Sequence, residues 1–219
     1  MFETSLTISV SDATIITMPI KTYFLILITF SSQLCFAQNW DINTLRDINV
    51  KRNTSLDGAY KAVSNTTLPI SIGVPAVLFS IGYFEHDSVT KHKALYIGGS
   101  VILSGIVSNL GKEIFKRNRP YVTYPDIQNL QNESSYSFPS GHASVAFALA
   151  TSVSIAYPKW YIIVPSFLWA GEVGYSRLHL GVHYPTDVIA GAVIGAGSTF
   201  LSYEVNKWLF HPKKRLLKH

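Results

Sequence analysis

Five long apolar stretches occupy most of the chain after residue 66, and they limit its fold more than any other feature. A helix that spans a membrane needs about 20 predominantly apolar residues, with a usual range of about 17 to 25. By this measure the third stretch is marginal and the other four are long enough. The charged fraction is 14%, against about 25% in a typical soluble domain. The stretches run over residues 67–84, 94–115, 143–157, 160–176 and 186–206.

These features predict an all-α integral-membrane helical bundle with five spans. The alternative is a soluble all-α protein whose apolar helices are buried. Since no internal repeat or low-complexity linker divides the chain, we expect a single domain over residues 38–219.

The N-terminus has the pattern of a targeting segment. Lys21 precedes the apolar run YFLILITF, and the small residues of CFAQ suit cleavage after Ala37. Residues 1–37 are therefore predicted to be either a cleaved signal peptide or an uncleaved signal-anchor helix. Because the apolar run comes late, Met18 is an alternative start. Either form predicts export from the cytoplasm.

The charges of the loops predict an orientation, because cytoplasmic loops are enriched in Lys and Arg. With the N-terminus inside and alternating spans, the loop 85–93, the turn at Lys159 and the tail 211–219 fall inside. The loop 117–141 falls outside, yet the segment that enters it, KEIFKRNRP, is the most basic of the chain. Basic residues placed against the rule favour a bound anion.

Three clusters of reactive residues lie at the predicted outer helix ends. They have the patterns K-x6-RP, PSGH and SR-x5-H-x3-D, in this order. Together these patterns resemble the type 2 phosphatidic acid phosphatase (PAP2) superfamily over about residues 112–187. The sequence SRLHLGVHYPTDVIAGAVIG is more similar to the membrane-embedded lipid phosphatases than to the soluble secreted acid phosphatases of that superfamily.

The resemblance implies a role for each motif residue. His183 is the nucleophile, Asp187 its orienting partner, and His142 the general acid and base. The phosphate ligands are Lys112, Arg119, Ser140, Gly141 and Arg177. No cofactor is implied.

The pair His183 and Asp187 makes chemical sense without the family. The two residues are four apart, and Pro185 suits the first turn of a helix, where its missing N–H costs nothing. Asp187 can then hold the imidazole in one tautomer and leave the other nitrogen free to attack phosphorus. This predicts a phosphohistidine intermediate. The alternative is a capping aspartate beside a structural histidine.

The other motif residues fit phosphoryl transfer. His142 follows Ser140 and Gly141 at the start of a predicted helix, where free N–H groups favour an anion. Proton transfer by His142 is worth roughly 10²- to 10⁴-fold in rate. The Lys and Arg residues of the motifs supply charge for the three equatorial oxygens of the transition state. A serine nucleophile is disfavoured, since no G-x-S-x-G elbow is present.

Four nearby residues lie outside the motif positions. Lys116 and Arg117 are expected to extend towards lipid headgroups, and His179 is expected at the surface or in a pocket wall. Glu172 falls within an apolar stretch, where an ionisable group usually has a paired or functional role. We hypothesise that it braces Arg177.

A metal site is not expected. Beyond His142, His183 and Asp187 the motifs hold no further carboxylate or cysteine, and the surrounding cationic groups would repel a metal ion. The single cysteine, Cys35, excludes an intramolecular disulfide and any thiolate cluster.

The leading prediction is a bacterial cell-envelope phosphatase, embedded in the bilayer, that acts on a lipid phosphate at the periplasmic or exterior face. Polyprenyl diphosphate, phosphatidylglycerophosphate, phosphatidate and lipid A all fit. The alternatives are a soluble exported acid phosphatase and a membrane protein that only binds or transports anions. A nucleic-acid partner is not expected, because the basic residues border apolar stretches without interleaved aromatics. The sequence carries no signal for an oligomeric state.

Overall fold

The computed structural model describes residues 5–6, 18–19 and 39–210, with side chains for residues 39–207. It divides into two units, Met1–Asn43 and Thr44–His219. In the first unit β1 (Ser5–Leu6) pairs antiparallel with β2 (Met18–Pro19). Most of the predicted signal segment, residues 1–37, lies outside the described residues, so that assignment remains a prediction.

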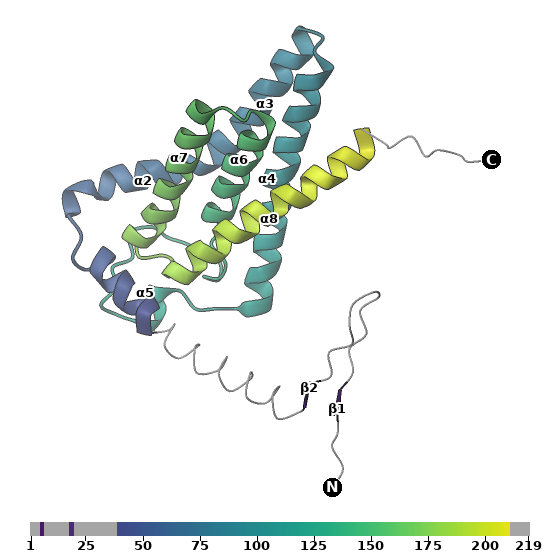
Figure 1. Cartoon of the computed structure of the whole chain (residues 1–219). Helices are drawn as coiled ribbons and strands as arrows, with labels where there is room; N and C mark the ends of the chain where they lie inside the picture. The colour runs from purple at the N-terminus through teal and green to yellow at the C-terminus, as the bar shows by residue number, and fades with distance from the viewer. Residues whose placement is uncertain (1–4, 7–17, 20–38, 211–219) are drawn as a thin grey trace. The chain divides into compact units, whose positions relative to one another are not determined.

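The second unit is helical, which confirms the all-α prediction; the two dipeptide strands of the first unit are the exception to it. Residues 39–49 form a helix that begins in the first unit, and the short helices η1 (Thr54–Leu56) and α2 (Asp57–Asn65) follow. The long helices are α3 (Thr67–Phe84), α4 (Ser88–Phe115), α6 (Gly141–Ala156), α7 (Trp160–His179) and α8 (Pro185–Phe210), and α5 (Pro120–Thr123) is a single turn (Figure 1).

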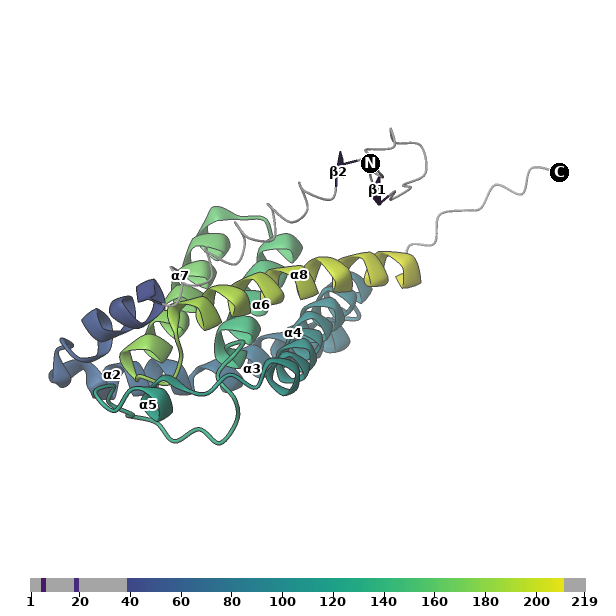
Figure 2. The ribbon, with the colours of Figure 1, turned by 90° about the horizontal axis from the view of Figure 1, so that it is seen from below.

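Helix α6 lies at the centre of the bundle, in contact with α3, α4, α7 and α8 (Figures 1 and 2). Small residues make this close packing possible. A Cβ on Gly195 of α8 would lie 2.3 Å from the Ser144 carbonyl oxygen, and one on Gly191 would lie 2.6 Å from that of Ser140. Small residues let helix backbones approach closely where no hydrophobic effect drives them together. The buried face of α6 contains Ala143, Ala146, Ala148 and Ala150.

The outer faces of the long helices are apolar. Ile72 of α3 is 63% exposed, Ile102 of α4 is 65% exposed, and Val193 of α8 is 67% exposed. Soluble monomers rarely expose contiguous apolar surface on this scale. The faces therefore favour a membrane protein over the alternative of a soluble protein with buried helices.

Within the part of the chain that the structure describes, three helical segments are long and apolar enough to cross a membrane: Thr54–Phe84, Ser88–Thr123 and Pro185–Lys207. Helix α6 is apolar but shorter, as the marginal length of its stretch predicts. The helical-bundle prediction is confirmed in this coarser form, whereas the count of five spans is not established by length and composition.

Candidate active site

Four long helices bring their ends together at one end of the bundle, where α4 and α7 finish and α6 and α8 begin (Figure 1). Two hydrogen bonds tie the motifs to one another. The Ser140 amide donates to the Asp187 carbonyl oxygen at 3.0 Å, and Arg119 Nη1 lies 3.4 Å from His183 Nε2. All three sequence clusters therefore meet in one place.

His183 lies in the turn between α7 and α8 and is 1% exposed. Its Nδ1 is 3.4 Å from Asp187 Oδ2, while its Nε2 faces Arg119. Burial lowers the pKa of His183 to about 4, although the hydrogen bond and charge of Asp187 oppose the shift. The imidazole is therefore neutral near pH 7. With the proton on Nδ1, the Nε2 lone pair is available as a nucleophile.

Asp187 is completely buried and heavily hydrogen-bonded. Its Oδ2 accepts the Tyr184 amide N–H at 2.9 Å and the Ser137 hydroxyl, as well as facing His183. Its Oδ1 accepts from Arg117 Nη1 at 2.6 Å. These contacts keep the Asp187 carboxylate ionised and fixed in position. A carboxylate that orients a histidine needs both properties.

Lys112, Arg119 and Arg177 are buried cations, with exposures of 8%, 3% and 0%. Buried charges need partners, and the segment after α5 supplies most of them. Lys112 Nζ donates to Ser135 Oγ at 2.8 Å. Arg119 Nε donates to the Ser135 carbonyl oxygen at 2.7 Å, and its Nη1 donates to that of Val182 at 2.8 Å.

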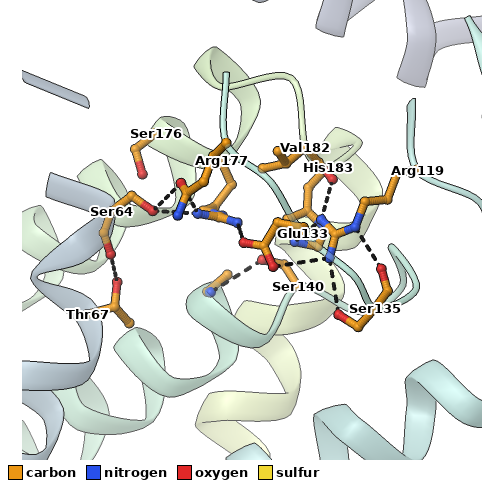
Figure 3. A network of polar contacts seen from close by, with 12 residues as sticks. Ser64, Thr67, Arg119, Glu133, Ser135, Ser140, Ser176, Arg177, Val182 and His183 are labelled. Atoms are coloured by element: carbon orange, nitrogen blue, oxygen red, sulfur yellow. Dashed lines mark hydrogen bonds and ion pairs between the residues drawn. The ribbon is translucent and has the colours of Figure 1, made fainter. Parts of the chain in front are cut away.

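The two terminal nitrogens of Arg177 bind different partners (Figure 3). Its Nη1 donates to Ser64 Oγ and, at 2.9 Å, to Gln131 Oε1. Its Nη2 pairs with Glu133. Its Nε is buried and has no hydrogen-bond partner within the described part of the chain. On the Nε–Nη2 edge of this guanidinium, the partner within the described residues is therefore the Glu133 carboxylate.

The N-terminus of α6 forms another wall of the site. Ser140 caps the helix, and its Oγ accepts from the Ala143 amide at 3.4 Å. A Cβ on Gly141 would meet nothing within 4 Å, so open space adjoins the backbone there. His142 follows in the first turn and is half-buried. It lies within electrostatic range of Arg177, Glu133, His183 and Lys112.

Three residues outside the motifs differ from their predictions. Arg117 does not extend towards lipid, because it pairs with Asp187 and lies 3.8 Å over the Tyr184 ring. Glu172 is exposed on α7, so the bracing of Arg177 that we predicted for it is wrong and belongs instead to Glu133.

His179 is neither at the surface nor in a pocket wall. It is 2% exposed, its Nε2 lies 2.8 Å from Asp57 Oδ1, and its ring packs 4.3 Å from that of Tyr60. Lys116 is exposed in a left-handed conformation at the end of α4, so its contact with lipid remains a prediction.

Sequence reasoning missed the partners that the irregular segment 124–140 brings to the site. Glu133, Ser135 and Ser137 contact the cations and Asp187. The letters QNESSYS indicate a loop, but they have no spacing that identifies which side chains turn inward. Only the concentration of acceptors next to a basic segment gives a signal.

The comparison with known families agrees with this geometry. Residues 93–210 match the model of the PAP2 superfamily. This chain belongs to the PAP2 superfamily. The match contains the three motifs, most of α4, and all of α6, α7 and α8, so the membership rests on the part of the chain that carries the chemistry.

Several relatives carry phosphatase names. An undecaprenyl-diphosphatase of Sulfolobus acidocaldarius is 33% identical over 107 residues, covering 48% of this chain and 52% of that protein. A lipid A 4'-phosphatase of Bacteroides thetaiotaomicron is 39% identical over 77 residues, covering 35% of this chain and 34% of that protein. The PAP2 chain thus spans about half or less of the length of these relatives.

Two solved structures have a similar fold. The LpxE structure of Aquifex aeolicus has a TM-score of 0.63 and 28% identity, over 75% of this chain and 95% of that one. A transmembrane PAP2-type phosphatidylglycerolphosphate phosphatase of Bacillus subtilis has a TM-score of 0.64 and 22% identity, over 88% of this chain and 98% of that one. The second likeness concerns the fold alone.

Proposed function

We propose that this PAP2 protein is an integral-membrane phosphatase that hydrolyses a phosphate monoester or diphosphate of a lipid through a phosphohistidine on His183. One observation carries the proposal. A buried, neutral imidazole has one nitrogen against a carboxylate and the other beside a guanidinium. That arrangement provides a nucleophile and a ligand for the phosphate that it attacks.

The cations bind and activate the phosphoryl group. Arg119 and Arg177 lie within electrostatic range of His183, and Lys112 lies within that of His142. The three cations offset the charge that spreads over the equatorial oxygens in the transition state. The N-terminus of α6, with Ser140 as its cap and open space beside Gly141, supplies N–H donors for a further oxygen.

The first step transfers the phosphoryl group to the protein. His183 Nε2 forms a bond to phosphorus while the bond from phosphorus to the lipid oxygen breaks. His142 donates a proton to that leaving oxygen, and Asp187 stabilises the positive charge that develops on the His183 ring. The lipid product leaves with its proton.

The second step restores the protein. His142, now neutral, takes a proton from water as the water oxygen bonds to phosphorus and the bond to His183 Nε2 breaks. Inorganic phosphate leaves, and His183 returns to its neutral form. No step needs a metal ion or an organic cofactor.

We place the site at the non-cytoplasmic face, with α3, α4, α6, α7 and α8 as five spans. The opposite end of the bundle carries the turns between α3 and α4 and between α6 and α7 (Figure 1). Lys93 and Lys159 lie near these turns, and Lys93 Nζ is 4.2 Å from the Tyr157 ring. The positive-inside rule assigns such an end to the cytoplasm.

The substrate class follows from the site and the relatives together. The headgroup phosphate reaches the cations at the helix ends, while the apolar tail stays beside the exposed faces of the spans. The names of relatives, which include undecaprenyl-diphosphatase, lipid A phosphatases and decaprenylphosphoryl-5-phosphoribose phosphatase, support a phosphate on a long-chain lipid.

The test is a panel of phosphorylated lipids in detergent, scored by release of inorganic phosphate, with a water-soluble phosphomonoester for comparison. Hydrolysis of at least one lipid, faster than the soluble ester and lost in His183→Ala, supports the proposal. The control is His86→Asn, which changes an exposed histidine whose left-handed backbone Asn tolerates.

Two outcomes would contradict it. Unchanged hydrolysis in His183→Ala would remove the nucleophile. Release of an active protein from membranes by salt alone, with a preference for the soluble ester, would favour the soluble acid phosphatase instead.

A further inference from the structure

Glu133 occupies the gap between two of the phosphate ligands (Figure 3). Its Oε1 accepts from Arg177 Nη2, and its Oε2 lies 3.5 Å from Arg119 Nη2. The side chain is 19% exposed, so it borders both the buried cations and the solvent. A carboxylate thus bridges two guanidinium groups at the place where a phosphate would bridge them.

The Nε–Nη2 edge of the Arg177 guanidinium is also suited to bind a phosphate. Its Nη1 is committed to Ser64 and Gln131, whereas Nη2 holds only Glu133 and Nε holds nothing in the described chain. The Nε–Nη2 edge can bind two oxygens of one anion side by side. Among the described residues Glu133 is the only group on that edge, so a phosphate that binds there must compete for the same nitrogen atoms.

The charge of Glu133 makes simultaneous occupancy unfavourable. Burial alone would raise the pKa of its carboxyl group, but the charges of Arg177, Arg119 and His142 outweigh burial and hold the pKa below its usual value. The group is therefore an anion. An anionic carboxylate and a phosphate at hydrogen-bond distance from the same nitrogen repel each other strongly in a poorly solvated site.

The local structure allows the Glu133 carboxylate to move away from Arg119 and Arg177 without unfolding of the segment that carries it. It lies in the segment 124–140, which has no helix or strand, and its neighbours Asn132 and Ser134 are exposed. Its carbonyl oxygen accepts from Tyr121 Oη at 3.1 Å, which anchors the backbone. Rotation about the side-chain bonds is then enough to carry the carboxylate into solvent.

We propose that Glu133 is a built-in competitor for phosphate, and this rests on the proposed phosphatase site. Its carboxylate neutralises Arg119 and Arg177 while the site is empty, leaves when a phosphorylated substrate binds, and returns to displace inorganic phosphate after hydrolysis. The residue thereby weakens binding of phosphate as a product and keeps the cationic cluster stable between turnovers.

The test is the affinity of the full-length protein in detergent for inorganic phosphate, measured by equilibrium binding and as the inhibition constant. Glu133→Gln keeps the size of the side chain and removes its charge. It is expected to bind phosphate about tenfold tighter, because a competing ion has been removed from a buried guanidinium. Glu85→Gln, the same change at an exposed position at the opposite end of the bundle, is expected to change nothing.

Thermal unfolding gives a readout that does not depend on turnover. Without phosphate, Glu133→Gln is expected to melt below the wild type, because Arg119 and Arg177 lose their anionic partner. Added phosphate is expected to raise its melting temperature by more than that of the wild type. Glu133→Asp keeps the charge on a shorter side chain. Its phosphate affinity and its melting temperature are expected to lie between those of the wild type and Glu133→Gln, and it replaces Glu133→Gln as the test variant if that variant does not fold.

The outcomes separate this inference from the proposed function. If the wild type binds phosphate and the Glu133 variants bind it equally or more weakly, Glu133 is a structural brace and the competitor role is wrong. If the wild type neither binds phosphate nor hydrolyses any lipid phosphate, the proposed function fails as well.

Discussion

Replacement of Asp187 by Asn perturbs the site at the point where most of its contacts converge. Oδ2 accepts from Tyr184 N, Ser137 Oγ and His183 Nδ1, while Oδ1 accepts from Arg117 Nη1. An amide has only one acceptor oxygen. Since the larger number of donors lies on the Oδ2 side, the Asn oxygen is expected there, and its NH₂ group then faces the Arg117 guanidinium.

The magnitude follows from these contacts. Hydrogen bonds to a charged group are worth about 1.5–3 kcal/mol each, and a donor left without an acceptor costs about 1–3 kcal/mol. Asp187→Asn weakens the bonds on the Oδ2 side and loses the bond to Arg117, which at 29% exposure can turn towards water. A loss of about 2–4 kcal/mol in unfolding free energy is expected.

The effect on catalysis is separate from that on stability. The neutral amide no longer stabilises the positive His183 ring that forms during phosphoryl transfer. In the Ser-His-Asp template the equivalent Asp→Asn change lowers kcat by about 10⁴-fold through the wrong tautomer. Because the Asn oxygen still faces Nδ1 here, a smaller loss of about 10²- to 10³-fold in kcat is expected.

The assay is phosphate release from the preferred lipid, together with thermal unfolding in the same detergent. Arg117→Ala and the double variant Arg117→Ala/Asp187→Asn complete a cycle. The double variant is expected to be less destabilised than the sum of the single changes, because the guanidinium that would face the Asn amide group is gone. Additive unfolding effects, or an Asp187→Asn variant with activity within threefold of the wild type, would refute the reasoning.

Three further predictions concern pH, packing and metal ions. Since burial lowers the pKa of His183 to about 4 and attack needs the neutral ring, kcat/KM should fall only as the pH drops through about 4; an acidic limb near pH 6.5 assigned to His183 would contradict this. Gly195→Val should cost about 3 kcal/mol or more in unfolding free energy, because its Cβ would lie 2.3 Å from the Ser144 carbonyl oxygen. Gly197→Ala, with open space around it, should leave the unfolding free energy unchanged or raise it by up to about 1 kcal/mol, because Ala favours a helix interior over Gly; equal melting curves for the two variants would show that the α6–α8 packing is wrong. EDTA should leave phosphate release unchanged, and a loss of activity restored by Mg²⁺ or Zn²⁺ would overturn the metal-free mechanism.

The convergence of the motifs could be predicted from the sequence because each motif borders an apolar stretch. Consecutive spans run in opposite directions, so the end of one span and the start of the next lie at the same end of the bundle. This alternation places Lys112, His142 and Arg177 together. The pair His183 and Asp187 is local, four residues apart at a helix start, and needs no tertiary information.

The remaining parts of the site depend on contacts between distant segments. Arg117 meets Asp187 across 70 residues, and His179 meets Asp57 across 122 residues, with no periodic pattern to indicate either pairing. Glu133 lies in a segment without helical or strand periodicity, so its inward direction depends on the tertiary fold. Glu172 lies five residues before Arg177, which led to the wrong prediction of a brace, because the sequence does not show that Glu172 is on an exposed face of α7.

The central claim is that helix ends from distant parts of the chain form a cationic site in which His183 takes the phosphoryl group. The direct measurement is a rapid quench with a ³²P-labelled substrate whose leaving group needs no protonation, using a His142→Gln variant in which hydrolysis of the intermediate is slowed. We predict an acid-labile, base-stable label on the peptide that contains His183. A label on another residue, or no labelled protein during active turnover, would contradict the account.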